Sequence, residues 1–84
     1  MEDLLEYLAR SMVDDPGAVV VESFEEDDGT IVLELEVGEG DAGKVIGRGG
    51  RTIAALRTVV KASAVKEDRR VLVDVIDSDL RRAP

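Results

Sequence analysis

The sequence predicts an α+β fold, in which a three-stranded sheet carries three helices packed on one face. Two observations lead to this prediction. Apolar residues recur at helical spacing over residues 2–13 and 51–65, and three other segments read as strands, the first rich in valine and the second with an apolar side chain at every other position. The predicted order along the chain is α-β-β-α-α-β. At 84 residues the chain fits one domain, which we place at residues 1–78, with a polar C-terminal tail at 79–84.

The first helix is predicted over residues 2–13, where Leu5, Leu8 and Met12 recur at helical spacing. The run Asp14-Asp15-Pro16-Gly17 ends it, because the residue before a proline disfavours helix and glycine permits a turn. The valine-rich segment from Ala18 to Phe24 that follows is typical of a strand.

The second strand is predicted from Thr30 to Val37 because its residues alternate in character. One face of this strand carries only apolar side chains, those of Ile31, Leu33, Leu35 and Val37. The other face includes Glu34 and Glu36, so the strand is half-buried. A polar turn with a glycine at its end separates the two strands, which predicts a hairpin.

Two helices and a third strand follow. Asp41 is predicted to cap a short helix over Ala42 to Ile46 through its side-chain oxygen. A second helix is predicted from Arg51 to Val65, with an apolar stripe formed by Ile53, Leu56 and Val60. After a charged turn, Val71 to Ile76 reads as the last strand.

Composition excludes several classes of function. The chain has no cysteine and no histidine, so it lacks disulfides, the commonest general base and the commonest zinc ligand. Its serines have no histidine to activate them, which argues against an enzyme. No apolar run approaches the roughly 20 residues of a membrane span, and the acidic N-terminus lacks the basic start of a signal peptide. We therefore expect a cytoplasmic, non-enzymatic protein without a metal or cofactor and without membrane contact.

The charge is unevenly distributed along the chain. Residues 1–42 carry one basic and fourteen acidic side chains, a formal charge of −13, whereas residues 43–84 carry ten basic and five acidic side chains, a formal charge of +5. The net charge of −8 alone argues against nucleic acid. The asymmetry, however, permits two interpretations: a basic nucleic-acid face set against an acidic body, or an ordinary solvated surface.

Three glycine patterns overlap in the middle of the chain. Residues 38–43 spell the dinucleotide-binding pattern G-x-G-x-x-G, but no acidic residue lies between Ala42 and Lys66 to hold a ribose. Residues 38–44 spell the phosphate-loop pattern G-x-x-x-x-G-K, but Val45 stands where a magnesium-binding serine or threonine is required. The chain is also too short for the large sheets on which either motif is built.

The third pattern, Gly47-Arg48-Gly49-Gly50, joins the two predicted helices. Glycine lets the backbone turn sharply and approach a ligand without a Cβ in the way. The helix that begins at about Arg51 presents its unpaired amides and positive dipole end to this turn, where an anionic phosphate is stabilised. Arg48 adds a positive charge at the tip. The alternative is a plain corner between helices, since G-x-x-G alone is common.

The stretch from Gly43 to Ile53, GKVIGRGGRTI, resembles the signature of KH domains, and the element order is that of the bacterial type II KH arrangement. Nearly the whole chain, about residues 1–78, resembles the small stand-alone bacterial KH proteins of the KhpA (YlqC-like) family. Supporting stretches outside the motif include Val13 to Pro16 and Leu56 to Thr58.

The resemblance implies binding of single-stranded RNA. In KH domains the G-x-x-G loop clamps the backbone of about four nucleotides, and the bases lie in an apolar groove between the helices and a strand. By the motif, the clamp is formed by Gly47, Arg48, Gly49 and Gly50. Its neighbours in the RNA site are Lys44, Ile46, Arg51 and Ile53, although both isoleucines could equally be core residues.

The resemblance also implies partners. It predicts an RNA chaperone or post-transcriptional regulator linked to cell elongation and division, which forms a homodimer or pairs with a larger KH-containing protein of the KhpB (Jag-like) family. The alternative is a protein-interaction adaptor whose KH fold mainly mediates dimerisation. Gly49 departs from the family, which often has a polar residue there. Because Tyr7 and Phe24, the only aromatic residues, lie outside the motif, we expect weak, sequence-tolerant binding.

Overall fold

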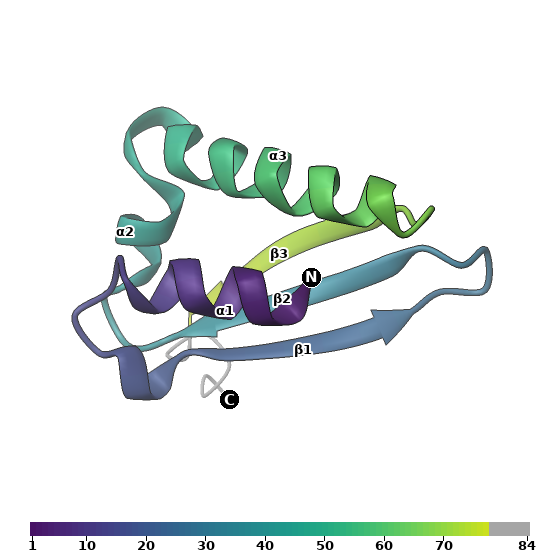
Figure 1. The fold of residues 1–84 in the computed structure, drawn as a ribbon. Helices are drawn as coiled ribbons and strands as arrows, with labels where there is room; N and C mark the ends of the chain where they lie inside the picture. The colour runs from purple at the N-terminus through teal and green to yellow at the C-terminus, as the bar shows by residue number, and fades with distance from the viewer. Residues whose placement is uncertain (78–84) are drawn as a thin grey trace.

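A computed structural model describes residues 1–77 of the chain. Its three-stranded sheet carries three α-helices on one face, in the predicted order (Figure 1). The tail predicted at residues 79–84 lies outside the described residues. The elements are α1 (Glu2–Arg10), β1 (Val20–Glu25), β2 (Ile31–Val37), α2 (Ala42–Ile46), α3 (Arg51–Lys66) and β3 (Val71–Asp77), with single 3₁₀ turns at Pro16–Ala18 and Arg48–Gly50.

The sheet has the strand order β1-β2-β3. The predicted hairpin is present: β1 pairs with β2 antiparallel, with Val21 opposite Leu35. β3 then pairs with β2 in parallel, with Leu33 opposite Val73. A parallel neighbour requires a crossover connection, and α2, the glycine loop and α3 supply it. β3 is therefore an edge strand that lies beside the helices of the crossover.

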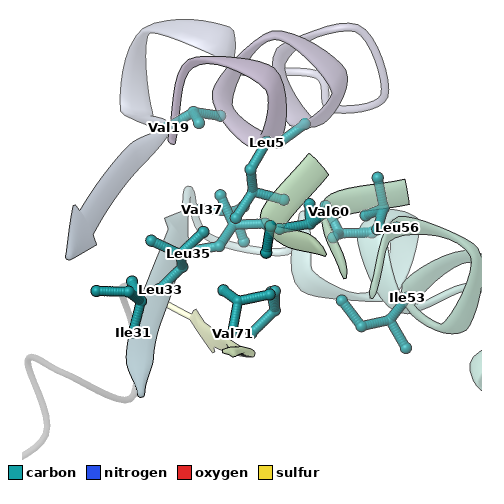
Figure 2. Packing of buried hydrophobic residues seen from close by; sticks show 14 residues of the cluster. Leu5, Val19, Ile31, Leu33, Leu35, Val37, Ile53, Leu56, Val60 and Val71 are labelled. Atoms are coloured by element: carbon teal, nitrogen blue, oxygen red, sulfur yellow. The ribbon is translucent and has the colours of Figure 1, made fainter. Parts of the chain in front are cut away.

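The core lies between the sheet and the helices. β2 alternates as predicted, and the side chains of Ile31, Leu33, Leu35 and Val37 are all buried on the helix-covered face. Figure 2 shows Leu5 of α1 and Val60 of α3 converging on this row. The same core includes Val45, Ile53 and Leu56, so it fixes both helices that flank the glycine loop.

The first helix is shorter than predicted. It ends at Arg10 rather than at residue 13, although Met12 and Val13 still pack against the core. The reason is a tertiary contact, because the main-chain N–H groups of Asp14 and Asp15 donate to the Asp41 carboxylate. The chain must leave the helix early to present those two donors.

Candidate nucleic-acid interface

The Gly47–Gly50 segment forms a tight, exposed turn between α2 and α3. Three of its residues have left-handed backbone angles, with φ of 77° at Gly47, 64° at Gly49 and 78° at Gly50. Two main-chain hydrogen bonds close it: Gly47 N–H donates to the Gly43 carbonyl at 2.9 Å, and Gly50 N–H donates to the Gly47 carbonyl at 3.1 Å. Arg48 carries the only side chain of the turn and is exposed.

Gly47 has no room for a side chain. A Cβ at this position would lie 2.2 Å from Thr52 Oγ1 and 2.9 Å from the Thr52 main-chain nitrogen, and the second atom cannot rotate away. Gly49 is different, since a Cβ there would meet nothing within 4 Å. Gly47 is therefore required by close packing, whereas Gly49 leaves open space at the tip of the loop.

The start of α3 is open to an anion. The N–H groups in the first turn of an α-helix lack intrahelical acceptors and carry the positive end of the dipole. The N–H of Arg51 donates to the Arg48 carbonyl, and the N-cap residue, Gly50, has no side-chain oxygen to cover the N–H groups that follow. α3 runs for 16 residues, and Arg48 and Arg51 add two exposed positive charges beside its N-terminus. A phosphate group fits this combination of amides, dipole and guanidinium groups.

The cations around the loop differ in how far their charge is already neutralised. Arg48 and Arg51 form no ion pair within residues 1–77. Lys44, by contrast, places its Nζ 3.1 Å from Asp14 Oδ2 and 3.5 Å from Asp41 Oδ1. The hydrogen bond to the Asp14 carboxylate and the negative charge of that group raise the pKa of Lys44 above its ordinary value.

Asp41 does not cap α2 as the sequence predicts. It occupies the N-cap position, but its side chain makes no capping hydrogen bond. Its carboxylate is buried and instead accepts N–H groups from Asp14 at 3.3 Å and Asp15 at 3.1 Å. Burial raises the pKa of Asp41, but these two hydrogen bonds and the charge of Lys44 outweigh burial and hold it below 3.8. Asp41 thus anchors α2 to the chain that leaves α1.

The two isoleucines predicted beside the loop lie in different environments. Ile53 is buried in the core beneath α3 and supports the loop from inside. Ile46, at the end of α2, keeps 38% of its surface exposed, so it can contact a ligand held by the loop. Ile46, Arg48 and Arg51 are thus all exposed, and the glycines of the loop separate them along the chain.

Arg57, a basic residue that follows the motif on α3, contacts the sheet. From the side of α3 it donates from Nε and Nη2 to the carbonyl of Val73 in edge strand β3, at 3.2 and 3.1 Å.

Metal-binding clusters and membrane-spanning helices are not found among the residues that the structure describes. Residues 1–77 contain no group of three or more acidic side chains placed to hold a metal ion. Within the same residues, no helix is long and apolar enough to cross a membrane.

Two helices joined by a G-x-x-G turn, packed over a mixed sheet whose edge strand completes a crossover, define a type II KH domain. The family model of the KhpA/KhpB KH domain matches residues 2–75. The chain therefore belongs to the KhpA/KhpB KH-domain family, a non-enzymatic one, as the sequence predicts.

Several relatives are similar over nearly their whole length. The chain is 50% identical to RNA-binding protein KhpA of Clostridium acetobutylicum over 76 residues, which cover 90% of this chain and 100% of the relative. It is also 50% identical to the KhpA of Halalkalibacterium halodurans over 78 residues, which cover 92% and 100%. The KhpA of Chlamydia trachomatis is 35% identical over 77 residues, which cover 92% and 97%. No solved structure gives a significant match.

Proposed function

We propose that this protein binds single-stranded RNA by clamping the sugar–phosphate backbone against the Gly47–Gly50 loop. The observation that carries the proposal is the open space above Gly49, flanked by the uncapped start of α3 and by the unpaired charges of Arg48 and Arg51. A phosphate entering this space meets main-chain N–H groups and two guanidinium groups without a steric barrier. The relatives named RNA-binding protein KhpA support RNA as the ligand.

The clamp should bind RNA with low affinity and with little sequence preference. Tyr7 lies on α1 and Phe24 on β1, so neither aromatic side chain belongs to the loop, and stacking worth about 1–3 kcal/mol per base is not available there. Lys44 contributes less than Arg48, because two carboxylates already offset its charge. Ile46 supplies an apolar contact for a base beside the clamp.

The test is fluorescence anisotropy with a labelled four-nucleotide RNA. The variant Arg48→Asp/Gly49→Asp puts two carboxylates where the phosphate would lie, and its affinity should fall at least about tenfold, because hydrogen bonds to charged groups are worth about 1.5–3 kcal/mol. Equal binding by wild type and this variant at moderate salt would refute the clamp.

A matched pair of glycine variants controls for strain and charge. Gly49→Asp and Gly29→Asp each add one carboxylate at a left-handed position, with φ of 64° and 87°, and a Cβ meets nothing within 4 Å at either site. Gly29 lies in the β1–β2 turn, away from the loop. Only Gly49→Asp should weaken binding of the short RNA.

We further propose that the protein is a cytoplasmic RNA chaperone or post-transcriptional regulator linked to cell elongation and division. On this proposal the protein forms a homodimer or pairs with a larger KhpB (Jag-like) protein, since a second site raises avidity where one site is weak. Exposed apolar side chains on the helices, Tyr7 at 71% and Val59 at 44%, favour a protein contact. They also support the second candidate function, an adaptor that acts mainly through dimerisation.

Sedimentation of wild type and of Arg48→Asp/Gly49→Asp separates the two candidates. If the loop serves RNA alone, both proteins have the same mass in solution and differ only in RNA affinity. A mass that falls in the variant, together with equal RNA affinity, would favour the adaptor.

A further inference from the structure

The sheet has a second face that no helix covers within residues 1–77. All three α-helices lie on one side of the sheet (Figure 1), where the buried side chains of β2 meet them. Because side chains alternate along a strand, every second residue of each strand points to the other side. We call this side the open sheet face, and its nine positions are Val20, Glu22 and Phe24 of β1, Val32, Glu34 and Glu36 of β2, and Leu72, Asp74 and Ile76 of β3.

The middle of the open sheet face is a row of three carboxylates. Glu22 lies opposite Glu34 in the antiparallel pair, and Glu34 lies opposite Asp74 in the parallel pair. Neighbouring strands are about 4.8 Å apart, and like charges directly opposite each other destabilise a sheet. Cations bound along this acidic row would relieve the repulsion between its members.

Apolar side chains flank the acidic row. On one side Phe24 lies opposite Val32, which lies opposite Leu72, and 47% of Phe24 and 49% of Leu72 remain exposed. On the other side Val20 and Ile76 lie at the two ends of a row with one glutamate between them. Exposed apolar surface bordered by charged residues is typical of a protein-binding surface.

The charge of the face selects the kind of partner. None of its nine residues is basic. Cations lie at its β3 edge instead, since Arg57 and Lys61 line a hollow together with Asp74, and Arg70, which precedes β3, interacts electrostatically with Asp28. A carboxylate-bearing face repels RNA, anionic membranes and the same face of a second copy, whereas a basic protein segment complements it.

The spacing of the acidic row fits an α-helix. Side chains three or four residues apart on a helix lie about 5–6 Å apart, which is close to the spacing of neighbouring strands. A helix that crosses the three strands can therefore place one cation against each of Glu22, Glu34 and Asp74. Apolar residues beside that basic stripe would then meet Phe24 and Leu72.

We propose that the open sheet face docks a basic amphipathic helix of a partner protein. Lysine or arginine side chains of the helix pair with the acidic row, and its apolar side chains cover Phe24, Val32 and Leu72. The proposal does not depend on the RNA clamp, because the helices that carry the Gly47–Gly50 loop lie on the other side of the sheet.

The test is fluorescence anisotropy with a labelled helical peptide of about 14 residues that has one stripe of lysines with leucines on both sides. It compares wild type with Glu22→Gln/Asp74→Asn, which removes two exposed carboxylates of the row. The affinity of this variant for the peptide should fall roughly fivefold, because two charge contacts are lost. A second peptide, with glutamate in place of every lysine, should not bind wild type.

Two further variants separate docking from general attraction. Glu39→Gln/Asp68→Asn also removes two exposed carboxylates, both outside the open sheet face, and its affinity should stay within about twofold of wild type. Phe24→Thr/Leu72→Thr keeps the charge and the preference for a strand, and its affinity should fall roughly fivefold because apolar surface is lost. Thermal unfolding checks that each variant is folded.

The outcomes that would overturn the proposal are distinct. Equal losses in Glu22→Gln/Asp74→Asn and Glu39→Gln/Asp68→Asn, or full binding by Phe24→Thr/Leu72→Thr, would leave only non-specific attraction between charges. Binding of the glutamate peptide would do the same to the charge argument.

Two other results would assign the face to a different occupant and exclude a separate partner. One is a peptide affinity that rises about tenfold or more in Arg81→Gln/Arg82→Gln, because this chain's own arginines would then compete for the face. The other is a lower mass of Glu22→Gln/Asp74→Asn than of wild type in sedimentation, because the face would then hold a second copy. Losses confined to the two variants of the open sheet face, at unchanged mass, support the proposal.

Discussion

The two ends of α2 are built from similar residues but differ in their electrostatics. Each end has a glycine-containing segment, Gly38–Asp41 before the helix and Gly47–Gly50 after it. At the first end, Asp41 is buried and is paired with Lys44 and with two main-chain N–H groups. At the second, Arg48 and Arg51 are exposed and form no ion pair among the described residues.

This difference separates anchoring from binding. The first end of α2, the paired end, fixes the helix to the chain that follows α1. The charges of Asp41 and Lys44 there stabilise the fold and are not free to bind a ligand. The second end, the open end at Gly47–Gly50, is held by packing and main-chain hydrogen bonds. The charges of Arg48 and Arg51 therefore remain available to a ligand. A basic residue near a glycine loop is therefore evidence for binding only when no carboxylate has already neutralised it.

The largest effect on stability is expected at the open end, from Gly47→Ala. The new Cβ would lie 2.2 Å from Thr52 Oγ1 at a φ of 77°, so we expect a loss of roughly 2–4 kcal/mol in the free energy of unfolding, from backbone strain and overpacking together. Urea unfolding measures it.

Gly49→Ala is the matched control for this loss. It has a similar φ of 64° but no neighbour within 4 Å, so it should cost only about 1 kcal/mol. If the two variants are equally stable, close packing at Gly47 does not hold the open end in place.

A smaller, pH-dependent effect is expected at the paired end, from Asp41→Asn. The carboxylate accepts two rather long hydrogen bonds, of 3.1 and 3.3 Å, so we expect a modest effect. Its pKa in the folded protein is depressed below 3.8. A depressed carboxyl pKa stabilises the fold fully above the ordinary value, and this contribution is lost as pH falls through the lower folded-state value.

The difference in unfolding free energy between wild type and Asp41→Asn should therefore be largest at pH 7 and should shrink below about pH 3.8. Urea titrations at several pH values measure it, and the subtraction cancels the other carboxylates. A difference that is constant with pH would show that the charge of Asp41 does not anchor α2.

Local patterns allowed most of the fold to be predicted. The alternation in β2 predicted its buried row residue by residue, and the glycine cluster marked the break between α2 and α3, because both signals lie within a few neighbouring residues. The order of elements then followed from short segments read one by one.

Tertiary contacts explain what the sequence did not reveal. Asp14 and Asp41 are 27 residues apart, and nothing local indicates that the carboxylate of one would bind the main chain of the other. The same contact ended α1 three residues early and engaged Lys44. The contact of Arg57 with β3 was not predicted for a similar reason, since its acceptor, the Val73 carbonyl, lies 16 residues away.

The salt dependence of RNA binding tests the contrast between the two ends most directly. Affinity for single-stranded RNA would be measured at several salt concentrations for wild type, Arg48→Ala and Lys44→Ala, which remove one charge each. We predict that Arg48→Ala makes the negative slope of log affinity against log salt shallower by about 0.7, the value for one lost phosphate contact. Lys44→Ala should leave this slope unchanged. Equal changes in the two variants, or a change in Lys44→Ala alone, would contradict the account.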